Sequence, residues 1–314
     1  MRLALVLIAS LLIGVAGLAA DLTDGLIVHL PFAGNADDAS GNNHHGTAYG
    51  PVLTTDRLGN PDAAYLFDGI DDYIRVEDTL PLRLNNTDFS LSVWAYETQR
   101  NTSFQDALLV KRGPFEEDGW FFSLTGQQSA SHQGVGKLYY QVSGGDDPRV
   151  YSAGSVSLDT WSHLAVTYNI TDHVARLYID GTQVAVSSYM PSPNPNTEFD
   201  LCVGSDSQGI GYHWHGKIDD VRIYNRQLSL DEIQVLAGIL GDLTAPEALS
   251  IARADGQVHL SWNPVPTATS YRVFSSTNPA LPHDDWALVA SNLQATQWST
   301  PETQKMFFFV RAYR

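Results

Sequence analysis

The chain has 314 residues and a formal net charge of −17 at pH 7. This length is sufficient for two domains with separate hydrophobic cores. The negative charge argues against nucleic acids and anionic membrane surfaces as partners. The only cysteine, Cys202, cannot form an internal disulfide and lies in an apolar strand pattern. We therefore expect a buried, unreactive thiol, and an exported protein without disulfides is ordinary in bacteria.

Residues 1–20 carry the pattern of a secretory signal peptide. An uninterrupted apolar run from Leu3 to Ala20 follows Arg2 and ends among small residues. This pattern predicts export and cleavage, which would leave the mature protein secreted or at the cell surface, without membrane insertion. The alternative is an uncleaved anchor, because the run approaches the length of a transmembrane helix.

The segment Gly216–Ile233 predicts a strand, a turn and a short helix. Val221 and Ile223 alternate with polar or aromatic neighbours, which is the period-two pattern of a half-buried strand. Ser229 and Glu232 have the spacing of a capping box at a helix N-terminus. Many short strands separated by turn residues, with one helix, predict a two-sheet sandwich over residues 21–241.

Five segments of this region, in order, resemble the laminin-G-like, concanavalin A-type jelly rolls. They are Gly25–Phe32, Asp38–Asn43, Phe67–Ile74, Trp161–Gly181 and Gly216–Ile233. The resemblance implies an all-β jelly roll with two packed sheets. Within it, Asp180–Gly181 also predicts a two-residue hairpin turn.

Residues 242–314 show a second strand pattern. Val258–Pro264 and Ser270–Phe274 resemble strands B and C of a fibronectin type III module, with Trp262 as its core tryptophan. Phe307–Ala312 resembles the penultimate strand, and the sequence ends two residues later, so we expect the last strand to be missing. An uncovered strand edge favours self-association through this module or a cover from the first domain. The predicted fold class is all-β, a jelly roll followed by a small immunoglobulin-like sandwich.

The Asp- and Asn-rich loop from Asp37 to Asn43 is a candidate calcium site. Ca²⁺ takes six to eight oxygen ligands, including carboxylates and backbone carbonyls, in a tolerant geometry. The family resemblance implies a structural calcium here, with a carboxylate returning from the last strand at the position of Asp219. The candidate ligands are Asp38, Ser40, Gly41, Asn42, Asn43 and Asp219. The alternative is a turn held by its own side-chain hydrogen bonds.

Two further clusters have both a binding and a structural interpretation. Asp68, Asp71 and Asp72 form a second acidic cluster, which serves either a turn or a metal ion. Tyr212-His213-Trp214-His215 is a candidate for stacking on a sugar ring or for binding a metal through two imidazoles. The alternative for this segment is packing, since the family places a packing aromatic at the position of Trp214.

The sequence contains no recognisable catalytic motif. Glycoside hydrolases of this fold carry an E-x-D-x-x-E strand that holds two carboxylates about 5 Å apart, and this motif does not occur here. Glu116 and Glu117 lie beside Pro114 and Gly119 in a predicted turn. We therefore expect no glycosidase activity.

The sequence thus predicts a non-catalytic extracellular binding or adhesion protein that recognises a glycan or a protein ligand through the jelly roll. This interpretation rests on family resemblance, because a fold does not fix a function. One alternative is a structural subunit of a cell-surface or extracellular matrix assembly. Another is an accessory module of a carbohydrate-active system.

Overall fold

A computed structural model describes residues 22–313, except 114–118, 132, 144–147, 194–197, 210, 240–245, 247, 266–267, 269, 279–285 and 302–305. The predicted signal peptide and the pair Glu116 and Glu117 lie outside the described residues. The chain divides into two compact units, one over Leu22–Ile239 and one from Leu240 onwards. None of the described helices is long and apolar enough to cross a membrane.

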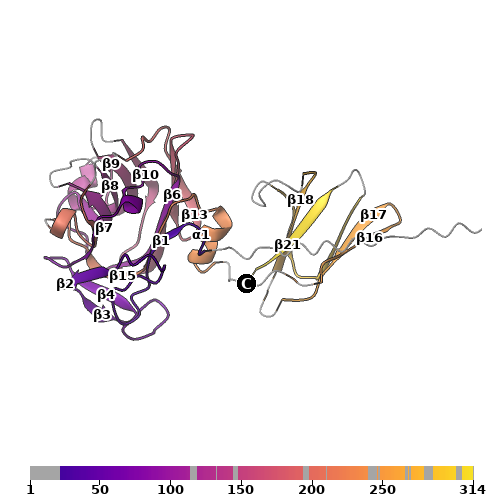
Figure 1. The fold of residues 1–314 in the computed structure, drawn as a ribbon, viewed down its shortest axis with the longest axis horizontal. Helices are drawn as coiled ribbons and strands as arrows, with labels where there is room; N and C mark the ends of the chain where they lie inside the picture. Colours follow the sequence, from indigo (N-terminus) through magenta and orange to yellow (C-terminus); the bar gives the residue numbers. More distant parts are fainter. Residues whose placement is uncertain are drawn as a thin grey trace, which may run out of the picture. The chain divides into compact units, whose positions relative to one another are not determined.

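The first unit is a sandwich of two antiparallel sheets (Figure 1). The first sheet has eight strands: β13 (Thr182–Val186), β12 (Val174–Ile179), β11 (Trp161–Asn169), β6 (Phe89–Glu97), β15 (His215–Tyr224), β4 (Ala64–Asp68) and β3 (Val52–Thr54) in this order, with β1 (Leu26–Leu30) paired to β15. The second sheet has seven: β10 (Arg149–Ser155), β9 (Lys137–Ser143), β8 (Gly119–Thr125), β7 (Gln105–Arg112), β14 (Leu201–Val203), β5 (Tyr73–Val76) and β2 (Gly46–Tyr49). The predicted all-β jelly roll is confirmed.

The core lies between the two sheets and follows the period-two pattern of the strands. In β6, Phe89, Leu91 and Val93 are buried in this core, and the residues between them face the opposite side of the sheet. Trp94 and Tyr96 therefore lie on the outer face of the first sheet. Cys202 on β14 is fully buried, as predicted.

The short-range turn and cap predictions are confirmed. Helix α1 (Leu230–Leu236) begins with a complete capping box between Ser229 and Glu232. The β12–β13 hairpin turns at Asp180 and Gly181, whose φ angles of 47° and 68° are those of a type I′ turn. Ile233 and Leu236 of α1 are buried together with Ala165, Tyr178 and Tyr224, so the helix covers part of the outer face of the first sheet. Short 3₁₀ helices lie in the described parts of the connections: η1 (Leu80–Arg83), η3 (Gln127–Ser131) and η4 (Ser207–Gly209).

The second unit is built from two three-stranded antiparallel sheets. One holds β16 (Ser250–Ala254), β17 (Gln257–Ser261) and β20 (Gln297–Pro301), and the other holds β19 (Ala287–Leu293), β18 (Ser270–Ser276) and β21 (Phe307–Tyr313). Trp262 and Tyr271 are buried in the core of this unit with their ring centroids 5.4 Å apart. As far as the described residues extend, β21 stands last in its sheet beside β18. The fibronectin type III resemblance and the missing last strand stay predictions.

Candidate functional site

The predicted calcium loop is held by its own hydrogen bonds. The Asp38 carboxylate accepts the backbone N–H groups of His29, Ser40 and His44, each at 2.9 Å, and the Ser40 hydroxyl at 2.8 Å. Burial opposes the charge of Asp38, but these donors outweigh it and lower its pKa. The Asn42 side chain donates to the backbone oxygens of Leu26 and Ile27, which fastens the loop to β1. Gly41 and Asn43 take the positive φ angles that the turn requires, 90° and 62°.

Asp219 has a different set of partners. Its Oδ2 lies 2.5 Å from an Nη of Arg57, whereas the neighbouring Asp220 contacts β1 through the His29 side chain at 2.9 Å. Among the interactions of the described residues, none joins Asp219 to Asp38. The turn interpretation therefore accounts for the hydrogen bonds of this loop without an ion, and calcium at this position stays a prediction.

The segment from Tyr212 to His215 does not form one exposed aromatic surface. Trp214 is fully buried in the main core, which is the packing alternative. Tyr212 packs edge-on against Phe121 with the ring centroids 6.2 Å apart. His213 is half-buried, and its Nδ1 is buried without a hydrogen-bond partner among the described residues. His215 lines a pocket that is described below.

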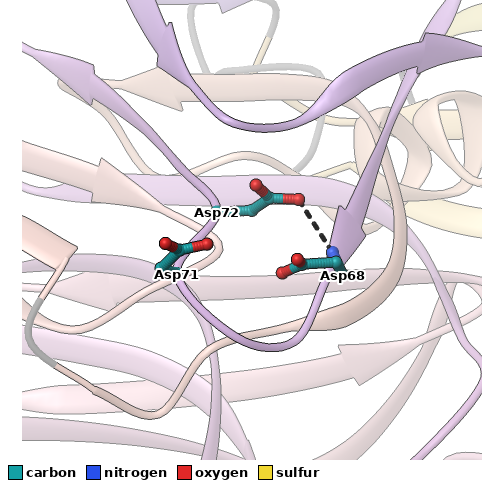
Figure 2. A group of neighbouring side chains, drawn as sticks. All are labelled: Asp68, Asp71 and Asp72. Atoms are coloured by element: carbon teal, nitrogen blue, oxygen red, sulfur yellow. Dashed lines mark hydrogen bonds between the residues drawn. The ribbon is translucent and has the colours of Figure 1, made fainter.

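Three carboxylates come together where β4 ends and β5 begins. Figure 2 shows Asp68, Asp71 and Asp72 gathered around one turn, and each offers a ligand atom within 4.8 Å of the others. Asp72 is buried and accepts the Asp68 N–H at 2.8 Å, whereas Asp68 and Asp71 are exposed. Burial raises the pKa of Asp72, and so do the charges of Asp68 and Asp71. We call these three residues the acidic triad, and they could hold an ion.

The triad fits a hard cation by its chemistry. Its carboxylate oxygens are the ligands that Ca²⁺ prefers, and their mutual repulsion would be relieved by a positive charge. His213 lies nearby, and its pKa is lowered by burial, although a hydrogen bond with the Asp72 backbone and the charges of all three carboxylates act in the opposite direction. Gly50 allows the close approach of the β2–β3 turn, because a Cβ there would lie 1.9 Å from Asp72 Oδ1.

A pocket opens beside the triad at one end of the first sheet. We call it the rim pocket, and it is lined by Gly50, Val52, Leu66, Phe67, Asp68, Asp72, Thr98 and His215. Val52 and Leu66 are exposed and form an apolar wall, while Asp68, Asp72, Thr98 and His215 supply hydrogen-bonding groups. Pairing of His215 with Asp68 and of Val52 with Leu66 fixes this arrangement, because these pairs are opposite each other in neighbouring strands.

A pair of tyrosines adjoins the pocket in sequence. Tyr49 precedes Gly50 and Tyr73 follows Asp72, and their rings are stacked 4.7 Å apart with an interplanar angle of 11°. The Arg75 guanidinium lies 5.4 Å from the centre of the Tyr49 ring. Tyr49 remains partly exposed, so an aromatic surface with a polar neighbour borders the triad.

A buried charge cluster lies behind the pocket. Glu97 and Arg100 form an ion pair, and Asp106 accepts the backbone N–H of Asn101 at 2.5 Å. All three charged side chains are more than nine-tenths buried. The Asn101 side chain donates to the backbone oxygen of His213, and Thr98 of the same connection lines the pocket. The cluster therefore anchors one wall of the rim pocket.

The family of the first unit follows from comparison with known proteins. Residues 68–234 match the family model described as the concanavalin A-like lectin/glucanases superfamily. The chain belongs to this superfamily. None of the curated proteins matches the sequence significantly.

Solved structures share the superfamily fold at low sequence identity. Domain 4 of AbnA, an extracellular arabinanase from Geobacillus stearothermophilus solved with arabinotriose, has a TM-score of 0.54 and 18% identity over 68% of this chain and 98% of that one. The binding domain of Paraclostridial Mosquitocidal Protein 1 has a TM-score of 0.53 and 16% identity over 83% and 73%. A botulinum neurotoxin type C structure, reported with a dependence of cell entry on two ganglioside molecules, has a TM-score of 0.52 and 12% identity over 82% and 66%. At these identities the likeness shows the fold alone.

Sequence reasoning missed most of the rim pocket. Val52, Leu66 and Thr98 are unremarkable strand or loop residues, and only the strand register brings them together. Two signals were detectable: the acidic triad, because three aspartates occur within five residues, and His215 in the His-rich segment.

Proposed function

We propose that the protein is an extracellular, non-catalytic glycan-binding protein whose jelly roll holds a neutral sugar in the rim pocket. The observation that carries this proposal is the lining of the pocket. Ligand sites typically combine apolar walls with a few polar groups that fix orientation. Here Val52 and Leu66 face the carboxylates of Asp68 and Asp72 and the imidazole of His215. Carboxylates accept hydrogen bonds from sugar hydroxyls, and apolar walls suit the C–H faces of a sugar ring.

The charge of the site supports a neutral ligand. Two triad carboxylates, Asp68 and Asp72, line the pocket with Asp71 close to them, and the whole chain carries −17. An anionic sugar would be repelled at short range by the triad and at longer range by the net charge. A glycan without acidic groups meets neither penalty.

The glycan proposal is tested with a matched pair of variants. Val52 and Val186 are 58% and 54% exposed, and they lie on β3 and β13 at opposite ends of the strand order of the same sheet. An array of neutral and acidic glycans identifies the ligand of the purified protein. Calorimetry should then show at least a tenfold loss of affinity, about 1.4 kcal/mol, for Val52→Asp and less than a twofold change for Val186→Asp. Equal affinities of the two variants, binding of acidic glycans only, or turnover of the bound glycan would contradict the proposal.

We also propose that a structural Ca²⁺ binds this unit, at the acidic triad in preference to the Asp38 loop. A ligand that binds only the folded state stabilises it by about 2.7 kcal/mol at a hundredfold excess over Kd. This corresponds to an increase of about 5–10 °C in Tm for a unit of this size. Calcium is therefore expected to raise Tm relative to EDTA, as followed by scanning calorimetry.

Two variants separate the candidate calcium positions. Asp71→Asn removes the charge of an exposed triad carboxylate, and it should abolish the calcium increment. Asp38→Ala lowers Tm through its lost hydrogen bonds but should keep the increment. The reverse pattern would move the ion to the Asp38 loop, and an identical Tm in calcium and EDTA would reject both sites.

The remaining parts of the chain serve delivery and presentation in this proposal. Residues 1–20 direct export, and the second unit is a fibronectin type III-like spacer or docking module. The buried pair of Trp262 and Tyr271 supports this assignment. Self-association through β21 stays a prediction.

A further inference from the structure

The rim pocket continues into a row of side chains on the outer face of the first sheet. Val52 pairs with Leu66, Leu66 with Lys217, Lys217 with Tyr96, and Tyr96 with Trp161. Directly opposed residues in neighbouring strands project to the same face. These five residues, which we call the cross-strand row, therefore lie side by side across β3, β4, β15, β6 and β11.

The contacts along the row show that it faces outwards. Val52 and Leu66 are exposed, and Lys217, Tyr96 and Trp161 are half-buried. The Lys217 ammonium lies 5.6 Å from the centre of the Tyr96 ring, and the Tyr96 and Trp161 ring centroids are 5.7 Å apart in an edge-to-face arrangement. The row thus ends in two aromatic rings that solvent can reach.

The aromatic residue of the next row on the same face, Trp94, is half-buried and is engaged by contacts within the protein. The Arg57 guanidinium lies 4.7 Å from the centre of the Trp94 ring, and the Trp94 indole N–H donates to Leu236 of α1. Beyond it, α1 covers Ala165 and Tyr178. The two aromatic rings of the cross-strand row, by contrast, contact neither Arg57 nor α1 among the described residues, and the row leads into the rim pocket through Val52 and Leu66.

We propose that the ligand is an extended oligosaccharide whose end occupies the rim pocket and whose following units lie along the cross-strand row. This inference rests on the proposed glycan-binding function and specifies its substrate class. Four inter-strand steps of about 4.8 Å give the row a length of about 19 Å. This is several times the length of a single sugar ring. Tyr96 and Trp161 offer apolar faces to sugar C–H groups, and Lys217, which lies between Leu66 and Tyr96 in the row, offers a hydrogen-bond donor to sugar hydroxyls.

An oligosaccharide aligned along the row also gains affinity from each further sugar unit that contacts it. Once the end sits in the pocket, the following units bind intramolecularly, at a high effective concentration. A short sugar gains only the pocket contacts. Affinity should therefore depend on chain length, whereas a site limited to the pocket would not distinguish a monosaccharide from a longer chain.

The probes are linear neutral gluco-, manno-, xylo- and arabino-oligosaccharides of one to six units, titrated calorimetrically into the purified protein. For the series that binds, affinity should rise until the chain reaches about four units, one for each inter-strand step. Trp161→Ala should lower the affinity for the four-unit chain at least tenfold and leave the affinity for one or two units within twofold. Tyr189→Ala, an exposed tyrosine beside His173, is the matched control and should change neither.

The outcomes separate the two proposals. Binding that is independent of chain length and of Trp161, but lost in Val52→Asp, overturns the extended-ligand inference and supports glycan binding at the rim pocket. Absence of binding, or binding that Val52→Asp does not weaken, overturns both. If Trp161→Ala does not fold, Lys217→Ala should give the same length-dependent loss, and a loss that is equal for short and long chains would contradict the row.

Discussion

Replacing Arg100 by methionine is expected to destabilise the jelly-roll unit by about 3–5 kcal/mol at pH 8, because this removes the partner of a buried charge. Arg100 is paired with Glu97 and donates to the backbone oxygen of Val156 at 2.5 Å, and its positive charge acts to lower the pKa of Asp106. Without it, the buried Glu97 carboxylate loses its partner and must be protonated or forced into solvent. The free energy of unfolding from denaturant titrations gives the size of the loss.

The control for Arg100→Met is Arg176→Met. Arg176 lies half-exposed on β12, and its replacement should change the free energy of unfolding by less than about 0.5 kcal/mol. The penalty of Arg100→Met should shrink at pH 5, because carboxyl groups that bind protons no longer require the guanidinium. A loss below 1 kcal/mol at pH 8 would show that the cluster is better solvated than its burial implies.

Replacing Asp106 by asparagine is expected to stabilise the unit at pH 8 and to flatten its pH dependence. Burial raises the pKa of Asp106 to about 7, against a usual value of 3.8, although the Asn101 N–H and Arg100 act in the opposite direction. The folded protein therefore holds this proton more tightly than the unfolded chain. The contribution of Asp106 to stability is complete below about pH 4 and is lost as the pH rises through 7.

The size of this effect is bounded by the pKa shift. A shift of about three pH units corresponds to at most about 4 kcal/mol, and the Asn side chain avoids this loss because it carries no charge. Calorimetric Tm values of the wild type should fall between pH 5 and pH 8 more steeply than those of Asp106→Asn. Asp62→Asn, at an exposed carboxylate, should keep the wild-type slope. A parallel slope for Asp106→Asn would mean that another group carries the pH dependence.

The fold was largely predictable because it is encoded in local patterns. The alternation in β6 and β15, the Asp180–Gly181 turn and the Ser229–Glu232 capping box each depend on residues close in sequence. The helix and the hairpin turn therefore occur where the pattern indicated.

The site was less predictable because its chemistry depends on register and on burial. An Asp- and Asn-rich loop has the same composition whether it binds calcium or caps its own turn, and only the donors around Asp38 distinguish the two. The segment around Trp214 is compatible with either a surface binding site or core packing, and only the burial of Trp214 decides for packing. Val52, Leu66 and Thr98 have no local signal of function, because they meet only when the first sheet forms.

The central claim is that a neutral glycan binds at the rim pocket, and hydrogen exchange of the purified protein with and without a bound glycan tests it most directly. The ligand should be the oligosaccharide that binds best in the calorimetric series. Protection is expected in peptides that cover residues 49–53, 66–73, 96–99 and 213–217, which carry the pocket and four of the five residues of the cross-strand row. Protection confined to the second unit, or to the part of the second sheet where Phe121 stacks on Tyr139, would contradict the account if the rim pocket showed no change.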